Sequence, residues 1–268
     1  MIGERKHPML ELLGFVPVLL LAVLFVTPYS WVGSIAFAGW RVNDAPFKLG
    51  NFVHAFDLAY KGTSFAMLGF NSLLVTLSVA LLGGTVAALA AYVLARFRFA
   101  ARDAIFLVIV ATMMFPWQVT LIPNFVLMRD FGWFNSYYAL IVPAIPKAFA
   151  VFLLRQQMIS LPHETLEAAR LDGASEGLIF WSIVLPMVRP ALGAAMLLIA
   201  LSEWNNYLWT YLVADDGFHT TLPVAINRLG RWSESYMAAI MLSMLPPSLV
   251  FLSFQNLFGQ ALALGGKR

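Results

Sequence analysis

Few residues in this sequence could carry covalent or metal chemistry. There is no cysteine, so disulfide bonds and thiol chemistry are excluded. The chain also lacks a glycine–lysine phosphate loop, so we do not expect it to hydrolyse ATP. The histidines share no metal-ligand spacing; they are His7, His54, His163 and His219. The sequence therefore predicts no enzyme, no metal site and no cofactor bound by this chain.

A second group of residues has the types and spacing of a docking element, in the segment 160–186. Pro162 suits the first turn of a short helix, where its missing N–H is harmless. Gly173 suits a left-handed residue at the end of that helix. A second short helix should begin at Ala174 or Ser175, and the proline that ends the segment should stop it.

Two short helices that meet at a glycine would make a compact, rigid projection. Ala168 and Ala169 keep one side thin, so that another protein's backbone could approach closely. Glu167 and Arg170 are three residues apart and can pair on the helix surface. The projection suits docking into a cleft, and physical reasoning alone leaves open a surface loop that lies on the membrane.

Polar residues within apolar stretches form the third group. Glu203 is expected near the middle of a membrane helix, where a charge costs about 2.5–3.5 kcal/mol. Asn206, Tyr207 and Thr210 follow at spacings that put all four on one helical face. That face could line a translocation path whose hydroxyl and amide groups suit a hydroxyl-rich solute, or it could form an interhelical hydrogen-bond clamp between two subunits. We prefer the clamp.

Lys147 is the other anomalous charge. It could face a cavity and contact an anionic group, pair with Glu203, or extend outward to the membrane surface, which is our expectation. Several aromatic residues fall near predicted membrane interfaces and are interpreted as anchors, with sugar stacking as the alternative. They are Trp117, Trp133, Tyr137, Tyr138 and Trp232.

The elements that must position these residues are membrane helices. The chain is 60% apolar and only 12% charged, whereas soluble domains carry roughly 25% charged residues. Apolar runs of this length form helices, because lipid satisfies no backbone group and barrel strands would alternate. The six predicted spans are 11–34, 66–94, 103–124, 136–155, 188–212 and 234–258. We expect a single domain over residues 1–268, with the first span retained and not cleaved as a signal peptide.

The distribution of lysine and arginine predicts the orientation. With the N-terminus inside, ten cationic residues fall on the cytoplasmic side and seven outside. The short turn between Arg96 and Arg102 carries the clearest part of this bias. The model places both termini and the loop 156–187 in the cytoplasm, and the loop 35–65 outside.

The segment 160–186 resembles a known signature. Its fixed residues match the EAA motif of ABC importer permeases, with Asp172 and Gly173 in the usual place; the matching residues are Glu167, Ala168, Ala169, Gly173, Ile183, Leu185 and Pro186. Asn71 with Ser72, and the run 203–209, resemble the carbohydrate-uptake branch, the maltose- and glycerol-phosphate-type permeases. The resemblance covers about 66 to 258.

The resemblance implies an all-α membrane protein of six transmembrane helices with the type I ABC importer permease fold. It implies that the EAA loop couples transport to two ATP-binding subunits, which would hold the ATP and Mg. It further implies a second, homologous permease, an extracytoplasmic solute-binding protein, a sugar or sugar-like solute, and a place in the inner membrane. Nucleic acid is not an expected partner. The alternative is a secondary transporter or a channel that is not coupled to ATP.

Overall fold

The structure is a computed structural model that describes residues 8–38, 48–230 and 233–265, with side chains described between 15 and 254. Within these ranges the chain is helical apart from one short hairpin, so the predicted all-α class is confirmed. The predicted anchor Trp232 and the cationic residues at both ends of the chain lie outside the described residues.

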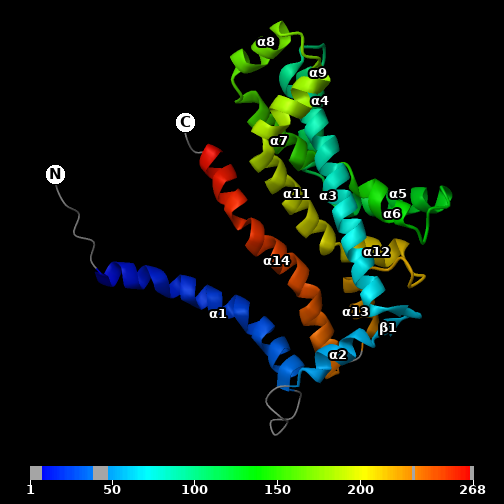
Figure 1. Ribbon diagram of the computed structural model, residues 1–268. Helices are drawn as coiled ribbons and strands as arrows, with labels where there is room; N and C mark the ends of the chain where they lie inside the picture. Colours follow the sequence, from blue (N-terminus) through cyan, green and yellow to red (C-terminus); the bar gives the residue numbers. More distant parts are fainter. Residues whose placement is uncertain (1–7, 39–47, 231–232, 266–268) are drawn as a thin grey trace.

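Three uninterrupted helices are long and apolar enough to cross a membrane. They are α1 (Pro8–Ala38), α3 (Phe65–Arg96) and α14 (Glu234–Gly265). Each exceeds the roughly 20 residues that a bilayer requires. These helices correspond to the first, second and sixth predicted spans, and α3 runs along the length of the bundle (Figure 1).

Two predicted spans are broken into helical parts that meet at an angle. α4 (Arg102–Thr112) and α5 (Trp117–Asp130) meet at 95°. α6 (Tyr137–Ile141), extended by the 3-10 turn η1 (Val142–Ala144), meets α7 (Ala148–Ile159) at 42°. Proline explains both breaks, because Pro116, Pro143 and Pro146 each remove a backbone donor.

The fifth predicted span differs most from the expectation. After α8 (His163–Leu171), the chain forms α9 (Glu176–Ile179), the π-helical turn η2 (Phe180–Val184) and α10 (Leu185–Met187). This segment meets α11 (Arg189–Trp204) at 80°. α11 ends before residue 212, and α12 (Tyr207–Val213) follows as a separate helix. With each bent pair counted as one span, the described helices give up to six spans, as predicted for the permease fold.

The described part of the loop 35–65, which was predicted on the outer side of the membrane, is structured. It contains α2 (Gly50–Phe56) and a hairpin of β1 (Ala59–Tyr60) and β2 (Thr63–Ser64), which lie with α13 (Leu222–Leu229) at the end opposite α8 (Figure 1). Lys61 Nζ lies 3.1 Å from Asp215 Oδ1, and Arg228 Nη1 lies 2.7 Å from the same oxygen. The Lys61 ammonium lowers the pKa of the Asp215 carboxyl. This network joins the hairpin to the segment between α12 and α13.

The core forms around α3, which packs against both α7 and α11. Small residues on α3 let these helices approach closely, as membrane helix interfaces prefer. A Cβ at Gly83 would lie 2.9 Å from the Ile145 carbonyl oxygen, and one at Gly84 would lie 2.5 Å from Met196 Cγ. Gly83 therefore allows the break between η1 and α7 to rest on α3.

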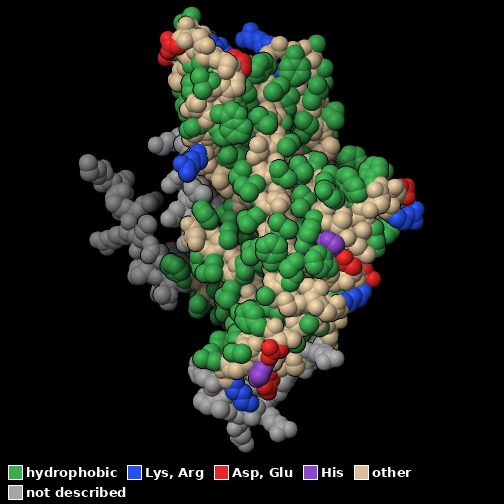
Figure 2. All heavy atoms as spheres, turned by 45° about the vertical axis from the view of Figure 1, so that its right-hand side comes forward, with side chains coloured by type: hydrophobic (Ala, Val, Ile, Leu, Met, Phe, Trp, Pro, Cys, Tyr) green, Lys and Arg blue, Asp and Glu red, His purple; other side chains and the backbone are tan. Residues whose placement is uncertain are grey.

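The outside of the bundle is apolar. Figure 2 shows hydrophobic side chains over most of the face drawn, with few charged groups among them. Phe15, Leu24 and Phe25 on α1 are each more than 60% exposed, and Leu107 and Ile122 on the α4–α5 pair exceed that value as well. Such surfaces suit lipid or another membrane helix.

A prediction follows for Gly83. Gly83→Val should lower the thermal unfolding temperature of the purified protein in detergent, because the added carbons meet a backbone carbonyl that cannot move cheaply; the expected cost is about 1–3 kcal/mol. Gly69→Val on the same helix is the matched control, since a Cβ there meets nothing within 4 Å. Equal destabilisation by the two variants would show that close packing at Gly83 is unimportant.

Candidate functional site

A polar cavity lies where the helix breaks meet. Its volume is about 650 Å³. Its wall comes from α5, from the break before α7, and from the end of α11 with the start of α12. The lining residues are Trp117, Thr120, Leu121, Asn124, Pro143, Ala144, Pro146, Lys147, Ser202, Glu203, Asn205, Asn206, Tyr207, Leu208 and Trp209.

An ion pair forms part of the cavity wall. Lys147 Nζ lies 3.3 Å from Glu203 Oε2, and Asn206 Nδ2 donates to Glu203 Oε1 at 2.8 Å. The Glu203 side chain is 4% exposed and the Lys147 side chain 20%. The expectation that Lys147 extends outward is therefore wrong, and the alternative of a pair with Glu203 is found. A carboxylate this buried requires such partners, because an unpaired buried charge is strongly destabilising.

The sequence suggested that Glu203 lies near the middle of a helix, but the structure places it at a helix end. It is the penultimate residue of α11, because the helix ends at Trp204. Asn205 Nδ2 donates to the Leu201 carbonyl at 2.8 Å, and the Asn206 backbone N–H donates to the Glu203 backbone carbonyl at 3.0 Å. Two consecutive asparagines could have signalled this break, since their side chains compete with the helical backbone.

The break also separates the four residues that were expected on one helical face. Asn206 and Tyr207 line the cavity with Glu203. The Tyr207 hydroxyl donates to Asn227 Oδ1 at 2.8 Å. Thr210 is 3% exposed and bonds the Asn206 carbonyl at 3.1 Å, so it stabilises the start of α12 behind the cavity wall.

Sequence reasoning missed part of the lining. Thr120 and Asn124 lie one helical turn apart on α5, a spacing that could have indicated a polar face. Trp117, expected to be an interface anchor, lies in the cavity wall. Trp209 is held in place by its indole N–H, which donates to the Ala139 carbonyl at 2.8 Å.

Gly173 and Ser175 in the docking element have the predicted conformations. Gly173 has φ +84°, the left-handed conformation that glycine adopts at no cost. Ser175 caps α9, and its hydroxyl accepts a hydrogen bond from the Leu178 amide at 3.3 Å. Glu167 and Ala168 are exposed on α8, and Leu171 at its end is 89% exposed. α8 projects at one end of the molecule, where a partner can reach it (Figure 1).

The ion pair within this element differs from the expectation. Arg170 does not pair with Glu167; its Nε donates to Glu176 Oε1 at 2.8 Å. This contact raises the pKa of the Arg170 guanidinium. The Tyr92 hydroxyl donates to Glu176 Oε2 at 2.6 Å. Glu176 therefore ties α8 to the membrane helix α3, a link between distant residues that local spacing could not reveal.

A second contact holds the base of the loop. The Arg96 guanidinium at the end of α3 donates to the carbonyls of Met158 and Leu161, the latter at 2.9 Å. It also lies 3.4 Å from His163 Nδ1. The loop is thus fixed to α3 on both sides of α8.

The sequence suggested that Pro186 stops the second helix, but the structure shows that it does not. The helical path continues through it and ends at Met187. The π-turn η2 precedes the proline, and the Leu185 amide bonds the Phe180 carbonyl five residues earlier. A wider turn moves aside the carbonyl that the proline ring would otherwise meet. Ile183 and Leu185 are half-buried, and Pro186 is exposed.

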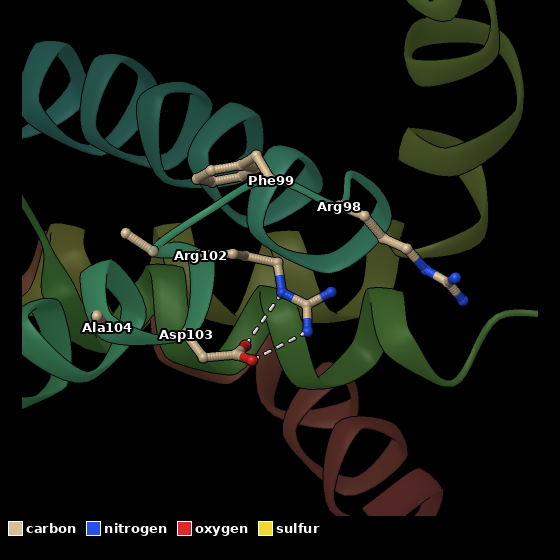
Figure 3. Close-up of a pocket in the computed structure, with 6 residues that line it drawn as sticks. Arg98, Phe99, Arg102, Asp103 and Ala104 are labelled. Atoms are coloured by element: carbon tan, nitrogen blue, oxygen red, sulfur yellow. Dashed lines mark hydrogen bonds and ion pairs between the residues drawn. The ribbon is translucent and has the colours of Figure 1, made fainter.

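A second hollow, of about 320 Å³, lies at the turn between α3 and α4 (Figure 3). Arg102 makes two contacts with Asp103, at 3.0 and 3.2 Å, and the Arg98 side chain points away from them. Arg102 and Asp103 therefore neutralise each other, whereas Arg98 has no such partner among the described residues that line this hollow. Among the residues that the structure describes, no group of three metal-binding side chains occurs.

Comparison with known proteins agrees with this geometry. Residues 80–264 match the model of the binding-protein-dependent transport system inner membrane component family. The chain is 32% identical over 262 residues to the arabinooligosaccharides transport system permease protein AraQ of Bacillus subtilis, covering 96% of this chain and 92% of AraQ. It is 34% identical over 244 residues to the sn-glycerol-3-phosphate transport system permease protein UgpE of Yersinia enterocolitica, covering 88% and 80%.

The fold also matches a solved structure. A chain of a bacterial ABC transporter involved in the import of the acidic polysaccharide alginate superposes with a TM-score of 0.82 at 22% identity, covering 96% of this chain and 99% of that one. The family match covers more than half of the chain and includes both the cavity and the docking element. This chain belongs to the family of binding-protein-dependent transport system inner membrane components.

Proposed function

We propose that the polar cavity is the path of a sugar through this permease subunit, and that the 156–187 loop couples the path to ATP hydrolysis on partner subunits. The chain is a sugar permease of the ATP-binding-cassette importer class, as its relatives and fold indicate. The observation that carries the proposal is the cavity itself, which gathers Lys147, Glu203 and Asn206 from two helix breaks.

The cavity wall suits a sugar. It combines hydroxyl and amide groups with the rings of Trp117 and Tyr207, and such mixtures of flat apolar surface and convergent polar groups are typical of ligand sites. Glu203, Asn206 and Tyr207 line this cavity together, which supports the path. Thr210, which lies behind the wall, would support the path without contacting the solute.

The loop suits coupling. Glu167, Ala168 and Leu171 are exposed on α8, while Glu176 and Arg96 fix the loop to α3. A partner that moves α8 would therefore move α3 with it. In the proposed complex two ATP-binding subunits seat the loop and hold ATP and Mg, and a second permease completes the path. The chain itself contributes no catalytic group.

A solute-binding protein would deliver the sugar at the end formed by α2, the hairpin and α13. One similar structure is a bacterial alginate ABC transporter in complex with an alginate pentasaccharide-bound periplasmic protein, with a TM-score of 0.67. Uptake of a labelled oligosaccharide by reconstituted vesicles, dependent on ATP, tests the function. A secondary transporter or a channel would not require ATP.

Orientation gives the next prediction. We expect both termini and α8 to lie in the cytoplasm. Thr165→Cys, exposed on α8, should escape an impermeant maleimide in spheroplasts and react after permeabilisation. Phe56→Cys, 54% exposed on α2, is the control and should react in both conditions. The chain's lack of native cysteine makes the assay direct. Labelling of Thr165→Cys in sealed spheroplasts would reverse the proposed topology.

Gly173 and Glu167 test coupling. Gly173→Val forces a β-branched residue into positive φ at a cost of about 1–2 kcal/mol, and Glu167→Arg reverses an exposed charge. Both proteins should reach the membrane at normal abundance but lose about tenfold in co-purification of the ATP-binding subunit or in substrate-stimulated ATPase.

Gly177→Val is the matched control for the loop, because Gly177 lies in α9 with nothing within 4 Å of its Cβ position. Immunoblots measure abundance, and reconstituted vesicles measure ATPase and uptake together. Full stimulated ATPase and uptake in both Gly173→Val and Glu167→Arg would refute coupling through this loop.

Asn206 tests the path. Asn206→Leu removes the hydrogen bond to Glu203 and an amide from the cavity, so uptake should fall about tenfold or more. Complex assembly and basal ATPase should stay intact. Gln118→Leu, an exposed amide on α5 outside the cavity, should transport normally. Dissociation of the Asn206→Leu complex in size-exclusion chromatography would favour the clamp instead.

A further inference from the structure

We infer that the cavity selects an uncharged, hydroxyl-rich solute, because its two charged side chains neutralise each other. The inference rests on the proposed transport path and adds the charge class of what travels through it. The named solutes of similar proteins do not decide this point, since arabinooligosaccharides are neutral whereas sn-glycerol-3-phosphate and alginate are anionic.

The charges of the wall sum to zero. Among the described residues that line the cavity, only Lys147 and Glu203 are charged, and they lie 3.3 Å apart. The second carboxylate oxygen of Glu203 accepts a hydrogen bond from the side-chain amide of Asn206 at 2.8 Å. Both oxygens of Glu203 therefore have a partner, and the positive charge of Lys147 is neutralised by the adjacent carboxylate.

A carboxylate or phosphate that leaves water needs an unpaired cation or several convergent donors. At this cavity an anion would have to share the ammonium of Lys147 with Glu203. It would then lie beside the Glu203 carboxylate, which is 4% exposed and has no other cation within the described lining. The pair thus disfavours an anion twice, through competition for the lysine and through repulsion by the glutamate.

A neutral polyol meets no such penalty. The Ser202 hydroxyl and the Asn124 amide lie in the same wall and can both donate and accept. The Thr120 hydroxyl donates to the Trp117 carbonyl at 2.8 Å and can still accept, while Asn205 keeps its side-chain carbonyl oxygen and one N–H beside its bond to Leu201. The ring of Trp117 offers a flat apolar surface to the C–H face of a sugar. These uncharged groups can form hydrogen bonds with the hydroxyls of a polyol.

The pair also joins α7 to α11, so its effect on selectivity must be separated from its effect on packing. Three variants change the cavity charge in different ways. Glu203→Gln frees the lysine, Lys147→Met with Glu203→Gln removes both charges, and Ser202→Lys adds a cation while the native pair stays intact. A purely structural role predicts no relation between cavity charge and the preferred solute.

The experiment uses the assembled importer in nanodiscs without binding protein, and follows tryptophan fluorescence because Trp117 and Trp209 line the cavity. The probes are arabinotriose and maltotriose as neutral solutes, and an alginate trisaccharide and sn-glycerol 3-phosphate as anions. For the unaltered protein the anions should bind at least about tenfold more weakly than the better neutral probe.

Glu203→Gln and Ser202→Lys should each shift the ratio of anion to neutral affinity by about tenfold toward the anions. The double variant should keep the original ratio. If Glu203→Gln fails to assemble, Ser202→Lys carries the test. Anion affinity equal to or above neutral affinity in the unaltered protein, an unchanged ratio in Ser202→Lys, or no neutral binding at all would overturn the inference. Failure of ATP-dependent uptake with the charge-dependent ratios intact would instead count against the proposed path alone.

Discussion

A chain in lipid must satisfy its backbone polar groups internally, and the other features of this molecule depend on that constraint. The breaks after α4, before α7 and after α11 leave peptide groups outside the helical pattern at the depth of the bundle. They converge on one polar cavity, where side chains and water can satisfy them. Lys147 directly precedes α7, and Glu203 and Asn206 flank the end of α11. The helix breaks and the cavity are therefore two aspects of the same arrangement.

The cavity and the docking loop share a single mechanical element, α3. Gly83 contacts the break that carries Lys147, and Tyr92 bonds Glu176 in the loop. Nine residues separate these two positions, or about 14 Å along a helix. A helix does not compress appreciably over that distance, so in the proposed coupling a displacement of α8 would reach the cavity as rigid-body movement of α3. Close packing at Gly83 then matters for transmission as well as for stability.

What could be predicted from the sequence was local. The left-handed Gly173 and the cap at Ser175 follow from the conformations of single residues, and both are confirmed. The partner of Arg170 was predicted wrongly, and the pair of Lys147 with Glu203 was only one of several alternatives, because each cation finds a carboxylate on another helical element. The position of Glu203 within its helix was predicted wrongly, because a long apolar run conceals where tertiary contacts end a helix. Six spans could be counted from apolar length, but their bends depend on prolines and asparagines acting together with neighbouring helices.

The paired charges in the cavity have an electrical consequence. A single charge that crosses a membrane potential of 100 mV exchanges about 2.3 kcal/mol with the field. Lys147 and Glu203 lie 3.3 Å apart on α7 and α11, so helix movements that keep them together carry opposite charges in the same direction. The electrical work on one cancels the work on the other. In the proposed transport cycle, a rearrangement that keeps the pair together would therefore be insensitive to voltage, and passage of a neutral solute would leave the membrane potential unchanged.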